Sequence, residues 1–308
     1  MGDAESRRQS GGPLAKAALG TLATGGAYAA LAAVRCRRSV RRARRRLDEY
    51  GARTAHLSYG AMTYLDEGEG EPLLSVHGLF GGYDQAFENV RDRLGSNRIV
   101  APSRFGYLGS DVLREGTPAD QAEAFVELLD VLGVEETYVL GASAGGTPAI
   151  RFALDHPERT KGLILYSSAP PSVAPPTKDP GYQASPPLLT SDYAMFLLNP
   201  FFQVAMGMSP ETIHGMLPIA DRRVGVDIDG RLTNPDMARN FADYPIEDLQ
   251  VPTLILHARD DRVSKFAPMA AAAPRFPDLT FVAYDTGGHL MVGHETEGKA
   301  TLDTFMGL

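Results

Sequence analysis

The sequence predicts an α/β protein with a mostly parallel, doubly wound sheet and one helical insertion that forms a lid. From residue 53 onward, short apolar runs typical of strands alternate with amphipathic patterns typical of helices. This alternation indicates parallel strands joined by crossover helices that cover both faces of a sheet. A chain of 308 residues, 44% hydrophobic and 22% charged, is long and apolar enough to build such a domain.

The expected elements follow one another along the chain. Two β-prone runs that meet at Tyr59 and Gly60 predict a hairpin near the start of the domain. Thr117 and Pro118 provide a cap and a first-turn residue for the best-marked helix, 117–134. Other helices are expected at 84–94, directly after Ser143 and at 300–305. Further strands are expected at 72–78, 97–106, 137–143, 162–170, 251–258 and 279–285.

One long segment, 171–248, interrupts the alternation of strands and helices. It begins with a proline-rich stretch, which is unsuited to a central strand, and continues with short helical patterns rich in Phe, Met and Leu. We expect a lid here, inserted into a core formed by residues 49–170 and 249–308. The alternative is a helical layer that completes the hydrophobic core, which is the more ordinary role of apolar helices.

Residues 1–48 form a basic N-terminal arm whose composition differs sharply from that of the body. They hold 11 Lys/Arg and 3 Asp/Glu, whereas the other residues hold 19 Lys/Arg and 35 Asp/Glu. Such an acidic body repels nucleic acid. An uncharged stretch, 17–34, is followed at once by the basic run 35–46. This order predicts that residues 17–46 attach to an anionic membrane from the cytoplasmic side. The alternative is a soluble cytoplasmic protein with an Ala-rich helix. In either case we expect a chain without residues 1–46 to keep its chemistry.

A candidate nucleophile stands at the centre of GASAG, where a strand pattern gives way to a helix pattern. Gly141 and Gly145 remove side chains that would clash as the chain reverses, and Ser143 between them projects its hydroxyl from a strained turn. A serine hydroxyl is a weak nucleophile at neutral pH, so it needs a base within hydrogen-bond reach and a third group that orients the base.

Candidates for these partners directly follow predicted strands near the C-terminus. His289 in YDTGGH is the candidate base, and Asp260 and Asp261 in HARDDRV are the candidate acids. Strand ends are rigid positions from which to orient such side chains, and the carboxyl edge of an open α/β sheet is where ligands bind.

A glycine-rich run, HGLFGG at residues 77–82, follows an earlier buried strand. Its backbone predicts an oxyanion hole in which the amide of Leu79 acts together with the amide of Ala144, directly behind the nucleophile. His77 at the start of the run is expected to be structural.

In this order the motifs HGLFGG, GASAGG, HARDDRV and GGH resemble the α/β-hydrolase superfamily, in its lid-containing branch of serine esterases and lipases. The resemblance covers the chain from about residue 57 to its end and implies a triad of Ser143, Asp260 and His289. In that family the acid lies three residues after the position held here by His257, and a valine follows three residues later, which favours Asp260 over Asp261. His257 itself departs from the family, in which glycine is common there.

The resemblance implies hydrolysis of carboxylic esters with small to medium apolar groups, through an acyl-enzyme and without a metal or cofactor. The expected substrate contacts are apolar residues: Phe80, Phe196, Phe201 and Met206. Three alternatives remain open. A perhydrolase or cofactor-free haloperoxidase and a carbon–carbon bond hydrolase would use the same triad, and a non-catalytic homologue would bind ligand without turnover. The chain has no tryptophan, whereas many carbon–carbon hydrolases of this superfamily place an indole in the site.

Overall fold

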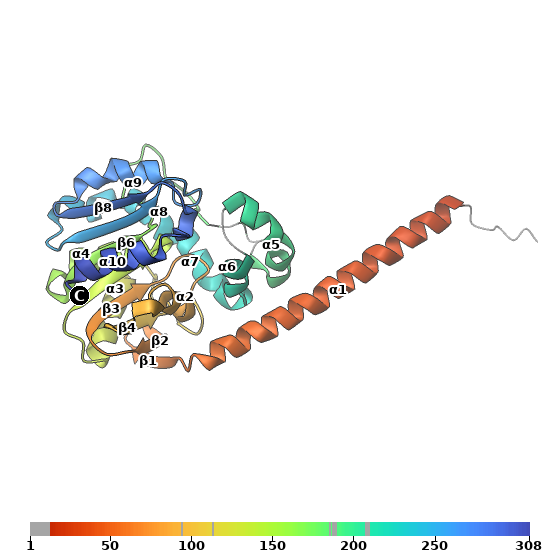
Figure 1. Cartoon of the computed structure of the whole chain (residues 1–308), viewed down its shortest axis with the longest axis horizontal. Coiled ribbons are helices and arrows are strands. Elements are labelled where there is room, and N and C mark those ends of the chain that lie inside the picture. Colours follow the sequence, from red (N-terminus) through yellow and green to blue (C-terminus); the bar gives the residue numbers. More distant parts are fainter. Residues whose placement is uncertain (1–12, 94, 113, 185, 187–189, 207–209) are drawn as a thin grey trace, which may run out of the picture.

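An eight-stranded mixed sheet, in the order β1-β2-β4-β3-β5-β6-β7-β8, runs through the protein (Figure 1). The computed structural model describes every residue except 1–12, 94, 113, 185, 187–189 and 207–209. The strands are β1 (Arg53–Leu57), β2 (Gly60–Glu67), β3 (Glu71–Val76), β4 (Asn97–Pro102), β5 (Thr137–Ala142), β6 (Thr160–Tyr166), β7 (Thr253–Ala258) and β8 (Leu279–Tyr284).

The sheet is parallel from β4 to β8 and antiparallel at its β1 edge. β1 and β2 form the predicted hairpin, in which Leu57 pairs with Gly60, and β2 continues antiparallel to β4. β3 pairs in parallel with β4 and β5, and β5 to β8 pair in parallel in turn. The carboxyl ends of β3, β5, β7 and β8 therefore lie at the same edge, as the predicted mostly parallel sheet requires.

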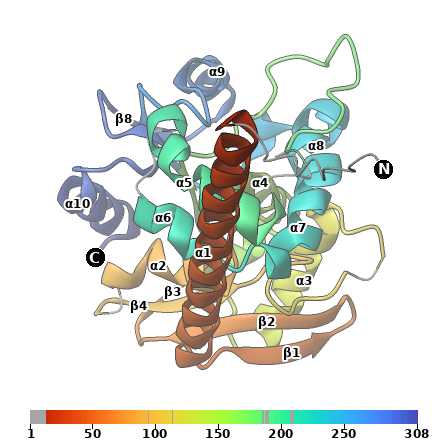
Figure 2. The same ribbon diagram turned by 90° about the vertical axis from the view of Figure 1, so that its right-hand side faces the viewer.

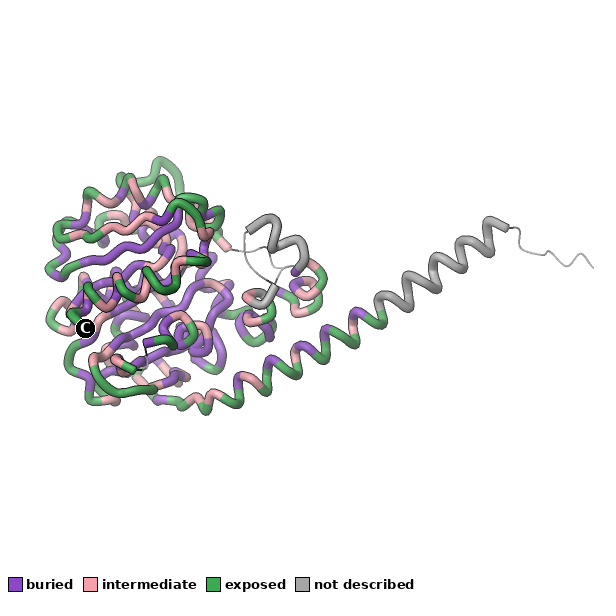
Figure 3. The backbone as a smooth tube through the Cα atoms, in the orientation of Figure 1, coloured by how far each residue is buried: buried purple, intermediate pink, exposed green. Residues whose placement is uncertain are grey.

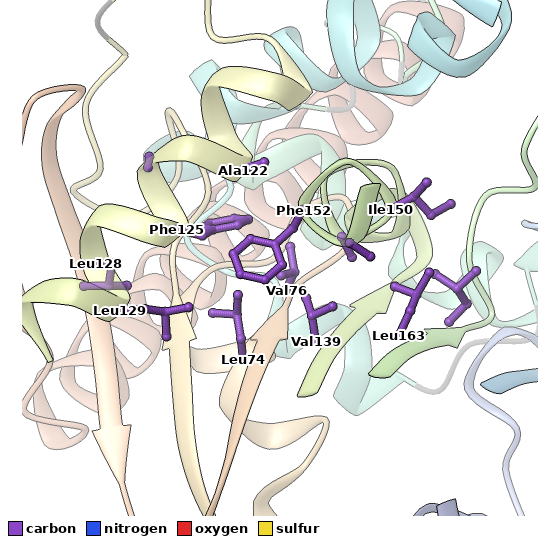
Figure 4. Close-up of a cluster of buried hydrophobic side chains, with 14 of the residues drawn as sticks. Leu74, Val76, Ala122, Phe125, Leu128, Leu129, Val139, Ile150, Phe152 and Leu163 are labelled. Carbon is purple, nitrogen blue, oxygen red and sulfur yellow. The ribbon is translucent and has the colours of Figure 1, made fainter. Parts of the chain in front are cut away.

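Helices cover both faces of the sheet. Successive residues of a strand point to opposite sides, so each strand contributes apolar side chains to both faces. On one face, Leu74 and Val76 of β3 pack in a cluster with α3 (Pro118–Val131), α4 (Gly146–Asp155) and α9 (Phe266–Ala272). Figure 4 shows the part of this cluster that α3 and α4 contribute. On the opposite face, Leu73 packs in a cluster with α2 (Tyr83–Glu88) and α10 (Glu295–Met306). The strands are consequently buried between helices whose outer surfaces are exposed (Figure 3).

The start of α3 confirms the predicted cap. The Thr117 hydroxyl accepts a hydrogen bond of 3.1 Å from the Asp120 amide, and the Asp120 carboxylate accepts one of 3.1 Å from the Thr117 amide. This reciprocal arrangement satisfies amide donors that the first turn of a helix leaves unpaired. Pro118, which has no amide hydrogen to leave unpaired, stands at the first helical position.

The segment predicted as a lid is helical and packs in two places. Between β6 and β7 it contains α5 (Asp192–Met206), α6 (Pro210–Gly215), α7 (Arg223–Ile228) and α8 (Asn234–Arg239). Its later part, including Met237 and Tyr244, belongs to the core cluster of α3 and α4. Its earlier part, including Met195 and Leu217, belongs to a separate apolar cluster. The later part of the insertion therefore does complete the core.

The N-terminal arm is a long helix, α1 (Pro13–Glu49). Its C-terminal end joins the body beside β1, and on the way there the helix passes α5 and α6, with which it makes contact (Figures 1 and 2). In the part of the chain that the structure describes, no helix combines the length and the apolar character needed to cross a membrane.

Candidate active site

Ser143 occupies a tight turn between β5 and α4. Its φ is 51°, a left-handed backbone conformation that is strained for a residue with a side chain. A Cβ on Gly141 would stand 2.7 Å from both the Ala149 methyl group and the Gly145 carbonyl oxygen, and one on Gly145 would meet the backbone oxygens at the end of β3. Both glycines are therefore required for strand and helix to approach so closely, as the pentapeptide predicts.

The predicted oxyanion loop, residues 77–82, passes directly against this turn. A Cβ on Gly78 would lie 2.9 Å from the Cβ of Ser143 and 3.5 Å from its Oγ. Leu79, the next residue of the loop, is half-buried, and Ala144, the residue after the serine, is buried. The two predicted amide donors thus belong to segments that touch each other at the candidate nucleophile.

A buried aspartate–histidine pair stands just beyond the carboxyl ends of β7 and β8. Nδ1 of His289 donates to Oδ2 of Asp261 over 2.8 Å, and the aspartate side chain is fully buried. The amides of Val263 and Ser264 donate to the other carboxylate oxygen over 2.8 and 3.0 Å. These amides fix the carboxylate, which in turn holds the imidazole with its proton on Nδ1. Nε2 then carries a free lone pair, as a general base requires.

The prediction that Asp260 is the acid is wrong, because its neighbour Asp261 forms the hydrogen bond with His289. The chain makes a hydrogen-bonded turn directly after β7, and this turn directs Asp261 inward and leaves Asp260 exposed. Val263, the valine whose spacing favoured Asp260, is 39% exposed and therefore does not fix the position of the acid through packing. Asp260 instead accepts a hydrogen bond of 2.8 Å from the Gly288 amide. It therefore fixes the loop that carries His289.

A second histidine lies against the same carboxylate. His257 is fully buried at the end of β7. Its Nε2 donates to the Ser264 carbonyl over 2.7 Å and lies 3.5 Å from Oδ2 of Asp261. Burial lowers the pKa of His257, against the opposing effect of the Ser264 carbonyl and of Asp261. The neutral imidazole is therefore favoured, and this departure from the family adds a donor beside the acid that holds His289.

His77 has a structural role, as the sequence predicts. Its Nδ1 donates to the Gly78 carbonyl over 2.8 Å, and its Nε2 accepts from the Arg104 amide over 2.9 Å. Burial, together with the nearby Arg104 charge, holds the pKa of His77 well below its usual value. Both ring nitrogens are thus engaged with the backbone, and neither is available to act as a base.

A buried ion pair behind the oxyanion loop was not predicted. The Arg104 guanidinium donates to both carboxylate oxygens of Asp229, over 2.6 and 2.5 Å, and to the His77 carbonyl over 2.9 Å. The Tyr107 hydroxyl donates to the same carboxylate over 2.6 Å. Burial alone would lower the pKa of the Arg104 guanidinium, but the attraction of Asp229 outweighs the effect of burial and raises this pKa. Asp229 lies in the insertion, so the pair joins the insertion to the oxyanion loop. No local pattern indicates a contact between residues 125 positions apart.

The residues predicted to contact substrate have different positions. Phe80 is buried and belongs, with Leu79, to the separate apolar cluster, here called the entrance cluster. Its other members come from α1, the insertion and the loop after β4: Val40, Ala43, Tyr107, Ala184, Met195, Met216, Leu217, Ile219 and Val226. The half-buried Phe196 packs edge-on against the His214 ring. The side chains of Phe201 and Met206 lie outside the described residues. Among the described residues, no three His, Cys, Asp or Glu side chains are grouped to hold a metal ion.

Comparison with known proteins identifies the family. The family model for the alpha/beta hydrolase fold matches residues 71–295, which include Ser143, Asp261 and His289. A 2-hydroxy-6-oxononadienedioate/2-hydroxy-6-oxononatrienedioate hydrolase of Pseudomonas putida is 30% identical over 249 residues, covering 73% of this chain and 84% of that protein. The chain therefore belongs to the α/β-hydrolase fold family, and we assign it as a hydrolase of that family.

Solved structures share the fold over different lengths of the chain. The esterase RhEst1 from Rhodococcus sp. ECU1013 matches with a TM-score of 0.65 at 21% identity, and covers 83% of this chain and 98% of that chain. A membrane phospholipase A, described as a bacterial virulence factor, matches with a TM-score of 0.61 at 19% identity. It covers 95% of this chain and 97% of that chain. Only 5% of this chain lies outside the match to the phospholipase. Because α1 has 37 residues, the match includes most of this helix.

Proposed function

We propose that this protein is a serine hydrolase that cleaves carboxylic esters with small to medium apolar groups. The observation that carries the proposal is the hydrogen bond of 2.8 Å between Asp261 and His289, at the sheet edge that also holds Ser143 in its strained turn. An acid, a base and a raised serine at the ends of three parallel strands are the components of a hydrolytic triad.

In the proposed reaction, Oγ of Ser143 attacks the ester carbonyl carbon while Nε2 of His289 takes the hydroxyl proton. Asp261 keeps the other ring nitrogen protonated and stabilises the imidazolium. The amides of Leu79 and Ala144 donate to the oxyanion. The tetrahedral intermediate then expels the alcohol, which receives the proton from His289, and the acyl group stays on Ser143. A water molecule, deprotonated by His289, then attacks the acyl carbonyl. The second tetrahedral intermediate expels Oγ of Ser143, which takes the proton back from His289, and the carboxylic acid is released.

The surroundings of the oxyanion loop favour an uncharged, apolar substrate. The entrance cluster places Phe80 of the loop among Met195, Leu217 and other apolar residues, the kind of lining that accepts an acyl chain. The two buried arginines beside the loop, Arg104 and Arg222, are already paired with the carboxylates of the insertion and of α2. The charge of each guanidinium is therefore already balanced by a carboxylate of the protein.

Carbon–carbon bond hydrolysis is the second candidate function. The Pseudomonas putida relative, named as a dienedioate hydrolase and 30% identical, favours it, because this reaction uses the same kind of triad. Two features of the chain argue against it. Arg104 and Arg222, the buried cations beside the oxyanion loop, are already paired with carboxylates of the protein, whereas a dienedioate brings two carboxylates of its own. The chain also has no tryptophan.

A panel of p-nitrophenyl esters from acetate to decanoate, assayed beside a ring-fission dienedioate, tests the proposed function. We expect turnover of the esters, labelling by a fluorophosphonate probe and no cleavage of the dienedioate. Cleavage of the dienedioate with inert esters would establish the second candidate. Ester binding without turnover would indicate a non-catalytic homologue, and activity that depends on hydrogen peroxide would indicate a perhydrolase.

We also propose that α1 attaches the protein to an anionic membrane surface. Seven arginines of this helix are exposed: Arg35, Arg37, Arg38, Arg41, Arg42, Arg44 and Arg45. Basic residues near an anionic bilayer contribute about 1 kcal/mol each to binding. A membrane phospholipase A is one of the solved structures that share the fold, and its match includes most of α1, which supports the proposal.

The full-length protein is expected to sediment with phosphatidylglycerol vesicles at low salt and to leave them at high salt, because screening shortens the range of charge attraction to about 3 Å at 1 M. Vesicles of phosphatidylcholine alone are the control and should not bind. Retention in high salt and in alkaline carbonate would contradict surface attachment. A fully unbound protein at low salt would contradict membrane association itself.

A further inference from the structure

The described part of α1 has two different faces. Side chains buried against the protein recur every three or four residues, the spacing of one helix face: Ala32, Cys36, Ser39, Ala43 and Leu47. The exposed arginines occupy the remaining surface. The inner face lies along the insertion, where α1 contacts α5 and α6 (Figure 2). The part of α1 from Ala32 to Leu47 therefore packs against the protein along several turns, and not only where the helix ends beside the body.

The inner face of α1 reaches the candidate active site through apolar packing. Val40 and Ala43 belong to the entrance cluster, together with Leu79 and Phe80 of the oxyanion loop. The insertion contributes Met195 and its neighbours to the same cluster. Three segments that are distant in sequence thus share one apolar contact region beside the predicted oxyanion hole.

A cavity of about 640 Å³ lies between α1, α2 and the insertion. Sites that enclose a small ligand have volumes of roughly 300–1,000 Å³. The lining includes Phe80 and Leu290, the residue that directly follows His289, and also charged side chains such as Arg46 of α1 and Glu88 of α2. The cavity therefore borders the oxyanion loop and the histidine loop, and its wall is part apolar and part charged.

Arg46 holds the segments around this cavity together. Its guanidinium donates to the Gly215 carbonyl of α6 over 2.8 Å and to Asp84 of α2 over 3.3 Å. Asp84 is almost fully buried and also accepts two hydrogen bonds, of 3.0 and 2.8 Å, from the buried Arg222 of the insertion. One carboxylate thus joins α1, α2 and the insertion, two residues after the oxyanion loop ends.

We propose that this cavity is a substrate subsite with α1 as one wall, and that Arg46 is a positioning residue for it. The subsite takes the longer arm of an amphiphilic ester, with apolar carbons beside Phe80 and Leu290 and a polar end toward the charged lining. The proposal rests on the proposed ester hydrolysis. The cavity is lined by Phe80 of the predicted oxyanion loop and by Leu290 beside His289, and Ser143 itself is not part of its lining. The proposal replaces the expectation that a chain without residues 1–46 keeps its chemistry, because truncation would remove this wall.

Filling the cavity tests the subsite directly. A Cβ on Gly215 would meet no atom within 4 Å, and the backbone there is not left-handed, so the Gly215→Leu variant is expected to fold. We expect its KM for p-nitrophenyl decanoate to rise about tenfold or more, and the ratio of kcat/KM for decanoate to that for acetate to fall by a similar factor. Gly95→Leu is the matched control, because Gly95 is exposed and equally open but lies outside the cavity. An unchanged KM for decanoate in Gly215→Leu would overturn the subsite.

Removing the Arg46 side chain tests the positioning role. Arg46→Ala is expected to raise KM for decanoate about tenfold, to lower the ratio of kcat/KM for decanoate to that for acetate by a similar factor, and to leave the fraction of sites titrated by fluorophosphonate unchanged. Arg45→Ala, on the exposed face of the same helix, should behave as wild type. A purely structural role would instead lower the melting temperature and the titrated fraction and reduce turnover of all esters alike, which would overturn the positioning role.

These outcomes separate the subsite from the function on which it rests. A wild-type protein that hydrolyses no ester and reacts with no fluorophosphonate contradicts the proposed function. A wild-type protein that hydrolyses both acetate and decanoate, with Gly215→Leu and Arg46→Ala unchanged, contradicts the subsite alone.

Discussion

The Ser143→Ala variant is expected to lose ester turnover by a factor of about 10⁴ or more, because no other group can form the acyl-enzyme and only binding and oxyanion stabilisation remain. Alanine keeps the Cβ that packs beside Gly78 and removes the hydroxyl alone. The melting temperature should therefore be close to that of the wild type. Measurement of kcat/KM for p-nitrophenyl butyrate and of thermal unfolding checks both expectations.

Labelling by a fluorophosphonate probe provides an independent readout of the same variant. The wild type should be labelled and Ser143→Ala should not be. Ser58→Ala, which changes an exposed serine near the start of the sheet, is the control and should keep full labelling. Substantial activity or labelling in Ser143→Ala would mean that another residue is the nucleophile.

The Asp261→Asn variant is expected to lower kcat by about 10⁴-fold, since replacing the aspartate of a serine triad by asparagine has an effect of this size. An amide group at this position donates where Nδ1 of His289 also donates, so the imidazole turns to the tautomer with its proton on Nε2. That tautomer cannot accept the proton of Ser143. The fold should survive, because asparagine keeps an oxygen for the amides of Val263 and Ser264.

Asp260→Asn is the matched control for Asp261→Asn, one residue away. Its amide oxygen can still accept from Gly288, where the carboxylate accepts over 2.8 Å, and we expect kcat to change by at most a few-fold. Measuring kcat for both variants with one ester decides between the adjacent aspartates. A larger loss in Asp260→Asn than in Asp261→Asn would contradict the hydrogen bond that joins Asp261 to His289.

The elements that position the site could be predicted because their signals are local. Gly141 and Gly145 stand where neighbouring backbone leaves no room for a side chain, so the pentapeptide itself reports the turn. Thr117, Pro118 and Asp120 cap α3 through contacts within four residues. The order of strands along the chain then places Ser143 and His289 at one edge of a parallel sheet.

The choice between two adjacent aspartates could not be made from the sequence. Which side chain points inward depends on how tightly the chain turns after β7, and on the amides of Val263 and Ser264 that capture a carboxylate. The family spacing, in which the acid lies three residues after the position of His257, assumes the turn that is usual in the family after this strand. Here the residue at the start of that spacing is His257, which bonds to the Ser264 carbonyl, and the acid comes one residue later.

The contacts around the cavity between α1, α2 and the insertion depend on long-range packing and leave no pattern in the sequence. Asp84 lies 38 residues from Arg46 and 138 from Arg222, yet it binds both. In the sequence Arg46 is one of a run of arginines, and nothing distinguishes it from the exposed Arg45 beside it. Its position on the inner face of α1 follows from the helical turn and from the place where the helix meets α6.

With a membrane bound on one face and an ester on the other, α1 would couple the two proposed binding events by thermodynamic linkage. An anionic bilayer at the arginines and an ester in the cavity would bind opposite sides of the same helix. If a bilayer changes the affinity for the ester by some factor, the ester must change the affinity for the bilayer by that same factor. Saturation with a non-hydrolysable ester analogue would then change the affinity of the protein for vesicles without changing any surface charge. The helix would thereby couple lipid binding to substrate binding.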